Sequence, residues 1–137
     1  MLHQAVRIYK NVNSITGEEW GDANYSVVCF VLTSVIKAFE NEGFDQGTMP
    51  DLNIMHALPA MDCPMCCGNG ELHTIFLYTH NNYWSQYVYQ FAHEFCHHVV
   101  GGPLDGLLDS SFWFEESLCE LASCYFMKKV IGIWDKE

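Results

Sequence analysis

The stretch His93-Glu94-Phe95-Cys96-His97 decides how the rest of this 137-residue sequence is interpreted. Residues four apart on an α-helix lie one above the other on the same face. His93 and His97 can therefore direct two imidazole nitrogens at a single metal ion. Glu94 lies one position round the helix, where its carboxylate can reach a water on that ion. This spacing predicts a zinc site at which the bound water becomes acidic and Glu94 takes its proton.

A catalytic zinc ion needs a third protein ligand and keeps its fourth position for water. Glu116 follows His97 by 19 positions and is the preferred candidate. Glu120 follows Glu116 by four positions, so these two carboxylates share a helix face. In that arrangement Glu116 binds zinc, while Glu120 accepts the ring N–H of one histidine and fixes its tautomer. The other candidates for the third ligand are Glu120 itself, Glu115, Asp105 and Asp109.

These residues give the sequence a resemblance to the gluzincin metallopeptidases, in which HExxH is followed by a glutamate on a second helix. The segment Trp113-Phe114-Glu115-Glu116-Ser117 resembles their W-x-N-E-G/A segment, with Glu116 on the zinc-binding glutamate. It departs from that pattern at Glu115, where the group usually has Asn, and at Ser117, where it has Gly or Ala. The resemblance covers residues 72–127 and is closest in size to the single-domain minigluzincins. A metzincin is excluded, because its third ligand would fall on Pro103.

The resemblance implies a zincin-like α+β fold, with a small mixed β-sheet, a packing helix, the HExxH helix and a glutamate helix. It also implies one Zn²⁺ per chain and a peptide or protein substrate. Glu94 is then the general base for peptide-bond hydrolysis, and His93, His97 and Glu116 hold the zinc. In gluzincins the strand before the active-site helix pairs with extended substrate, so residues 72–79 are expected to do so through backbone hydrogen bonds.

The composition indicates one folded domain spanning residues 1–137. Half of the residues are hydrophobic and only 17% are charged, which suits a compact core. The formal net charge of −11 makes nucleic-acid binding improbable, because such a surface repels phosphates. The sequence contains no recognisable signal peptide and no apolar stretch long enough for a bilayer. We therefore expect no membrane association and a cytoplasmic location, with the seven cysteines reduced.

Hydrophobic periodicity predicts three helices and three strands. The expected strands span residues 4–9, 51–58 and 72–79. The first expected helix spans residues 23–42, with Asp22 as its cap and Gly43 at its end. The second spans residues 83–100, and the third runs from Ser110 or Ser111 to about Ile131. Strand 72–79 carries apolar residues on both faces, so we expect it to be covered on both sides or to lie against a ligand.

The third helix is apolar almost all round and should be buried. Buried carboxylates need partners, so Glu116 and Glu120 would need a metal or histidines there. On the second helix, Cys96 is expected in the core and His98 at the surface or in support of the metal site.

The expected loop 59–70 contains Cys63, Cys66 and Cys67 in a spacing similar to a zinc knuckle. A structural zinc site normally needs four ligands, and only His56 and His73 are obvious additions. We therefore favour a reduced loop or an adventitious disulfide over a structural metal site here. The sequence leaves open whether these three cysteines bind metal.

Two other functional classes fit the same residues. The first is a non-catalytic zinc-binding domain, although such a site would not need Glu94. The second is a regulatory module or a fragment of a larger peptidase. Exposed apolar surface on the helix over residues 111–131 would favour this second class.

Overall fold

The computed structural model describes residues 6–10, 20, 23–43, 49–58, 60–68, 71–79, 83–100 and 109–135, with side chains of 109–114 and 133–135 left out. The elements in chain order are β1 (Val6–Ile8), α1 (Tyr25–Asn41), β2 (Asp51–His56), β3 (Met65–Gly68), β4 (Leu72–Leu77), α2 (Trp84–Val100) and α3 (Asp109–Asp135). The expectation of a mixed α+β fold is therefore confirmed. None of the described helices combines the length and apolar character that crossing a membrane requires.

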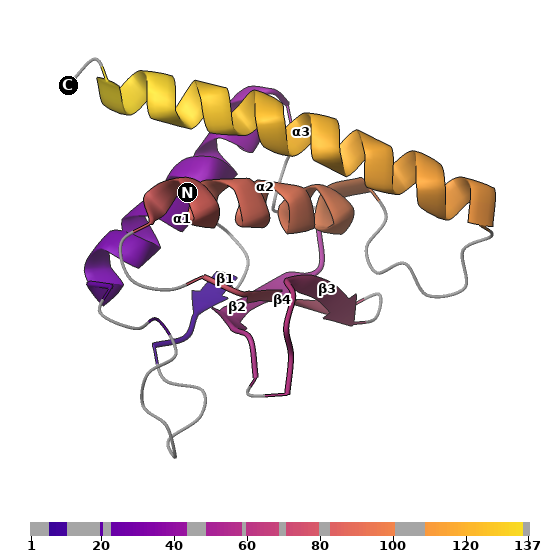
Figure 1. Cartoon of the computed structure of the whole chain (residues 1–137), viewed down its shortest axis with the longest axis horizontal. Helices are drawn as coiled ribbons and strands as arrows, with labels where there is room; N and C mark the ends of the chain where they lie inside the picture. Colours follow the sequence, from indigo (N-terminus) through magenta and orange to yellow (C-terminus); the bar gives the residue numbers. More distant parts are fainter. Residues whose placement is uncertain are drawn as a thin grey trace.

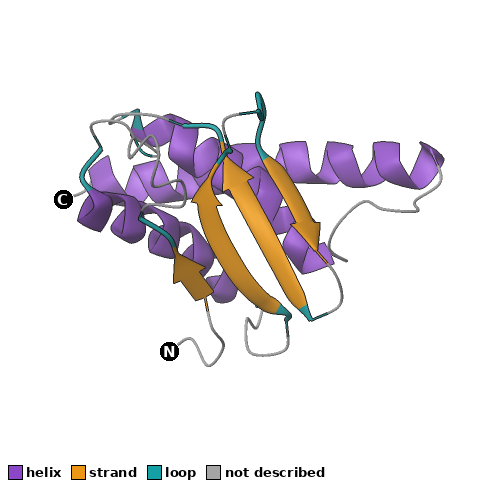
Figure 2. Ribbon diagram, turned by 90° about the horizontal axis from the view of Figure 1, so that it is seen from below, coloured by secondary structure: helices purple, strands orange, loops and turns teal. Residues whose placement is uncertain are grey.

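The described strands form one mixed sheet in the order β1-β2-β4-β3. β1, β2 and β4 run parallel, and β3 runs antiparallel to β4. The helices lie on one side of this sheet (Figures 1 and 2). Side chains in β2 alternate between buried and half-buried, because successive residues of a strand point to opposite faces.

β4 occupies an inner position of the sheet and has helices on one face only among the described elements. Ile75 and Leu77 are fully buried under the helices, whereas Phe76 on the opposite face is half-buried. Of the two alternatives predicted for this strand, cover by protein on both faces is not found among the described residues, and a ligand against the opposite face stays a prediction. The prediction that this strand is the sheet edge that pairs with an extended peptide is wrong, since β2 and β3 occupy its two sides.

β3 was expected to be part of a loop, and it forms the sheet edge next to β4. Its backbone pairs Cys66 with Ile75 and Cys67 with Thr74, so the two cysteines point to opposite faces of the sheet. Cys66 and Cys67 therefore cannot both bind one metal ion while the strand is formed. The knuckle-like spacing joins Cys63 and Cys66, and this pairing does not test it. Gly68 adopts a φ of +138°, and a Cβ there would approach the carbonyl oxygen of Leu72 to 2.2 Å. Only glycine fits this end of the strand.

Helix α1 begins at a different cap from the one predicted. The side chain of Asn24 accepts from the N–H of Ser26 at 2.8 Å, while Asp22 lies outside the described residues. Gly43 follows the helix with a φ of 102°, as expected for a residue that ends it. The buried face of α1 consists of Val28, Val31, Leu32, Val35, Ile36 and Phe39.

Helix α2 lies at the centre of the molecule, in contact with α1, α3, β3 and β4. Every residue from 91 to 98 is buried. Phe95 packs edge-on against Phe39 of α1 at 4.8 Å between ring centroids, and Phe39 stacks on Phe126 of α3 at 3.7 Å. These aromatic contacts fix the positions of the three helices relative to one another.

Helix α3 lies alongside α2 and is longer at both ends than predicted (Figure 1). Among its described side chains the buried ones are Cys119, Ser123, Phe126 and Val130, which share one face. Leu118, Leu121 and Tyr125 lie on the opposite face, and Leu121 is 71% exposed. The prediction that α3 is buried all round is therefore wrong. Apolar composition alone does not reveal that Leu118 and Leu121 of this helix are exposed among the described residues.

Candidate metal centre

Helix α2 places His93 and His97 one turn apart on the face that meets α3. Both imidazoles are buried, and their ring centroids lie 5.1 Å apart. The apolar stripe on another side of α2 holds this orientation, because Tyr87, Val88 and Phe91 are fully buried. The four-residue spacing in the sequence and the packing of α2 therefore both direct the two imidazoles toward α3.

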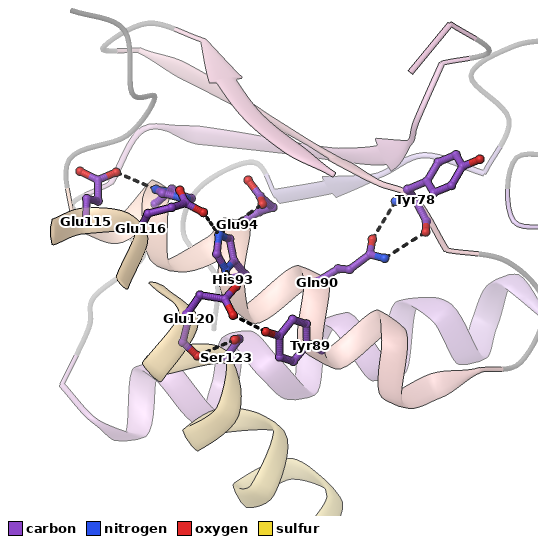
Figure 3. A network of polar contacts seen from close by, with 10 residues as sticks. Tyr78, Tyr89, Gln90, His93, Glu94, Glu115, Glu116, Glu120 and Ser123 are labelled. Atoms are coloured by element: carbon purple, nitrogen blue, oxygen red, sulfur yellow. Dashed lines mark hydrogen bonds and ion pairs between the residues drawn. The ribbon is translucent and has the colours of Figure 1, made fainter. Parts of the chain in front are cut away.

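Glu116 of α3 contacts both imidazoles, and Figure 3 shows it beside His93. Its Oε1 lies 2.7 Å from Nε2 of His93, and its Oε2 lies 2.9 Å from Nε2 of His97. The three side chains predicted to hold the metal thus converge at one point. Their donor set is two imidazole nitrogens and one carboxylate, which is one of the combinations found around catalytic zinc. Among the alternative ligands, Asp105 and the side chain of Asp109 lie outside the described part of the chain.

Glu94 lies beside the point where His93, His97 and Glu116 converge, but its carboxylate is held by β3 and not by α3. Its Oε2 is 3.9 Å from Nε2 of His93, and its carboxylate accepts a hydrogen bond from the backbone N–H of Cys66 in β3. Burial raises the pKa of Glu94 above its usual range, while the two imidazoles and the Cys66 N–H oppose that rise. Within the described residues, His93, Glu94 and His97 offer ligand atoms within 4.8 Å of one another. Glu94 is therefore close enough to act on a molecule bound at the centre.

The outer nitrogens of both histidines also face carboxylates of α3. Oε1 of Glu120 lies 2.8 Å from Nδ1 of His93, close enough for an ion pair but without the alignment of a hydrogen bond. Oε2 of Glu115 lies 2.6 Å from Nδ1 of His97 in an aligned hydrogen bond. Glu120 thus lies beside a histidine as expected, but it does not accept the predicted hydrogen bond from the ring N–H of His93.

The position of Glu115 was not anticipated, since it had been considered only as a ligand. Two histidines need two orienting partners, and this requirement could have pointed to the second acid beside Glu116.

Glu120 has a further partner that sequence reasoning missed. The hydroxyl of Tyr89 donates to Oε2 of Glu120 at 2.5 Å, and the hydroxyl of Ser123 donates to the backbone carbonyl of Glu120 at 2.7 Å (Figure 3). Tyr89 precedes His93 by four residues and so shares its helix face. That spacing was the signal available in the sequence.

A pocket of about 680 Å³ adjoins the centre on the N-terminal side of α2. Tyr89 links the two regions, because it lines the pocket and its hydroxyl contacts Glu120. The side-chain amide of Gln90 joins α2 to the end of β4, accepting from the N–H of Tyr78 at 2.8 Å and donating to its carbonyl at 3.0 Å. The remaining lining includes Tyr83, Gln86 and Met127, all uncharged.

Two residues adjacent in sequence to His97 are buried in the core and are not part of the metal centre. His98 is buried, and its Nδ1 lies 2.7 Å from Nδ1 of His73 in β4, so the expectation of a surface or metal-supporting residue is wrong. Burial, followed by the neighbouring His73, lowers the pKa of His98 to about 4, and its ring is neutral at neutral pH. Cys96 is a core residue as predicted and forms a thiol hydrogen bond with Cys119 of α3.

The side chains that form the centre come from α2 and α3, which follow one another in the sequence. The carboxylates of Glu94, Glu115, Glu116 and Glu120 surround two imidazoles, which leaves an excess of negative charge at one point. Such a cluster favours a divalent cation over an anion. Comparison of the chain with models of protein families, with curated proteins and with solved structures gives no match.

Proposed function

We propose that this chain is a zinc-dependent hydrolase of peptide bonds, similar in its chemistry to the gluzincins. The observation that carries the proposal is the convergence of Nε2 of His93, Nε2 of His97 and the carboxylate of Glu116, with the buried Glu94 beside them. The mixed sheet with an antiparallel edge strand, and the two helices across from it, support a zincin-like fold.

The ligand atoms of the three predicted metal-binding residues fit zinc. Two neutral imidazole nitrogens and one carboxylate oxygen are borderline to hard ligands, which zinc accepts in tetrahedral sites with one open position. The carboxylates of Glu115 and Glu120 would receive the N–H groups on the far sides of the imidazoles. They would thereby keep each Nε2 lone pair directed toward the ion.

Bound zinc would supply a water of lowered pKa and would polarise the substrate carbonyl. Glu94 accepts the proton from the attacking water and then delivers it to the leaving amine nitrogen. Burial makes its carboxylate a better proton acceptor than an exposed glutamate, since its pKa is raised. The Cys66 N–H holds that carboxylate in place between the sheet edge and α2.

The proposed substrate is an extended peptide that pairs with β3. This strand has a neighbour on only one side among the described strands, so its other edge can accept a peptide by backbone hydrogen bonds. The edge is adjacent to the centre, because Cys66 of β3 contacts Glu94. Backbone pairing with an extended peptide, which the sequence predicts for residues 72–79, is thus proposed for β3 instead.

Metal analysis combined with a peptide-cleavage assay tests this proposal. Purified wild-type chain should contain one zinc, Glu116→Ala should lose most of it, and Glu94→Ala should retain it. A peptide mixture incubated with the zinc-loaded chain and examined by mass spectrometry should show cleavage that Glu94→Ala lacks. A wild-type chain that binds no zinc under metal-replete, reducing conditions would contradict the proposal.

A non-catalytic or regulatory zinc-binding module is the second candidate. The exposed side chains of Leu118, Leu121 and Tyr125 on α3 favour it, because apolar residues gathered on one helix face are typical of an interaction surface. Stoichiometric zinc binding without cleavage of any peptide in the mixture would support this candidate over the hydrolase. Cleavage that depends on both zinc and Glu94 would exclude a purely regulatory role.

A further inference from the structure

Glu120 contacts the centre although its side chain is largely open to solvent. It is 53% exposed, yet both carboxylate oxygens face α2. Oε1 lies 2.8 Å from Nδ1 of His93, and Oε2 accepts from the hydroxyl of Tyr89 at 2.5 Å. The carboxylate is therefore held by two residues of one helix face, one turn apart.

The contact with His93 alone would leave Glu120 weakly positioned. A glutamate side chain has three rotatable bonds, and an exposed ion pair gains little over the solvated groups. The contact to Nδ1 also lacks the alignment of a hydrogen bond. A second anchor is needed if this carboxylate is to define the orientation of the imidazole.

Tyr89 has the properties of such an anchor. Its side chain has two torsions and a rigid ring, so little freedom is lost when its hydroxyl is fixed. The buried Ser123 lies within hydrogen-bonding reach of this hydroxyl and also bonds the backbone of Glu120. The hydrogen bond to Glu120, followed by burial, raises the pKa of Tyr89, so the phenol remains a donor at neutral pH.

We propose that Tyr89 is a positioning residue, whose hydroxyl holds the Glu120 carboxylate against Nδ1 of His93 and so keeps Nε2 of His93 directed at the metal position. The inference rests on the proposed zinc site and adds a residue to it. It does not depend on peptide hydrolysis, because the expected effect is on the affinity for the metal.

The effect can be measured as a double-mutant cycle in zinc affinity. The variants are Tyr89→Phe, Glu120→Ala and the double variant, each titrated with zinc against a chromophoric chelator. Loss of a group that supports a metal-binding histidine typically lowers affinity about 10- to 100-fold. Tyr89→Phe should lower it about tenfold in the wild-type background and by less than about twofold in the Glu120→Ala background, where nothing remains to be held.

Tyr83→Phe is the matched control. Tyr83 also lines the pocket next to α2, and its side chain is 59% exposed. This variant removes the same hydroxyl group from the same region and should leave zinc affinity unchanged. The visible spectrum of the cobalt-loaded chain gives a second measurement, since it should change in Tyr89→Phe and not in Tyr83→Phe. Thermal melts monitored by circular dichroism verify that all variants are folded.

Equal losses of affinity for Tyr89→Phe in both backgrounds would overturn the inference, as would an unchanged affinity in the wild-type background. A wild-type chain that binds zinc but cleaves no peptide would remove the hydrolase proposal and leave this test intact. A wild-type chain that binds no zinc would overturn both.

Discussion

Helices α2 and α3 both supply residues to the candidate centre, and they do so from opposite environments. His93, Glu94 and His97 of α2 are all buried. On α3 the side chains of Glu116 and Glu120 are 37% and 53% exposed. The buried helix presents fixed imidazoles, whereas the half-exposed helix presents carboxylates whose positions depend on their contacts. Disruption of α2 should therefore affect the whole fold, and changes on α3 should mainly affect the site.

The sharpest contrast is expected between Phe95→Ala on α2 and Leu121→Ala on α3. Phe95 is buried against Phe39 and Phe91, so its truncation should lower the free energy of unfolding by about 3–5 kcal/mol. Leu121 is exposed, and its truncation should change that free energy by no more than about 0.5 kcal/mol. Urea denaturation measures both. Similar losses would mean that α3 is covered on both faces in solution.

The second prediction separates catalysis from metal binding on α2 itself. Glu94→Gln preserves the shape of the side chain and removes its capacity to accept a proton. Peptide hydrolysis should fall about 100- to 10,000-fold, the usual contribution of a general base. Zinc content, measured on the same samples, should stay at the wild-type level. Parallel loss of zinc and activity would instead assign Glu94 to the metal ligands.

Two glycines allow the sheet edge beside α2 to be compared with the end of α3. Gly68→Ala should destabilise the chain by roughly 1–3 kcal/mol, because of its φ of +138° and the close approach of Leu72. Gly132→Ala in α3 meets nothing within 4 Å and should stabilise the chain by about 0.5–1 kcal/mol. Thermal unfolding should shift in opposite directions. A stable Gly68→Ala variant would show that β3 is not held as described.

The last prediction concerns the orienting carboxylate on α3 that sequence reasoning missed. Glu115→Gln keeps a hydrogen-bond acceptor near Nδ1 of His97 and removes the charge. Zinc affinity should fall about tenfold, at the low end for such partners. Glu71→Gln, an exposed acid outside the centre, is the control and should leave the affinity unchanged. An unchanged zinc affinity in Glu115→Gln would show that the hydrogen bond between Glu115 and His97 does not support metal binding.

What the sequence predicted well was local. The four-residue spacing of His93 and His97 and the apolar stripe on α2 follow from helix geometry alone. The position of Glu116 required one further assumption, that a second helix lies across the first. β3 could not be foreseen, because its strand conformation comes from pairing with β4 and not from its own pattern.

The other wrong or missing predictions have the same cause: the sequence does not show which elements pack against one another. The helix position of His98 predicts the surface or a place in support of the metal site, because the sequence does not show that His73 of β4 packs against it. The exposed face of α3 was assigned to the core because composition does not reveal which faces have neighbours. Glu115 and Tyr89 were missed because each acts through a residue of the opposite helix.

The bridge formed by Glu116 links the folding of this chain to the supply of metal ions. A cation held by His93, His97 and Glu116 would bind only where α3 lies across α2, so binding and docking are thermodynamically linked. At a free zinc concentration about 100 times the dissociation constant, the linkage would add about 2.7 kcal/mol to the stability of the docked state. Amide protons of α3 would then exchange with solvent more slowly as zinc increases, and chelation would restore their exchange.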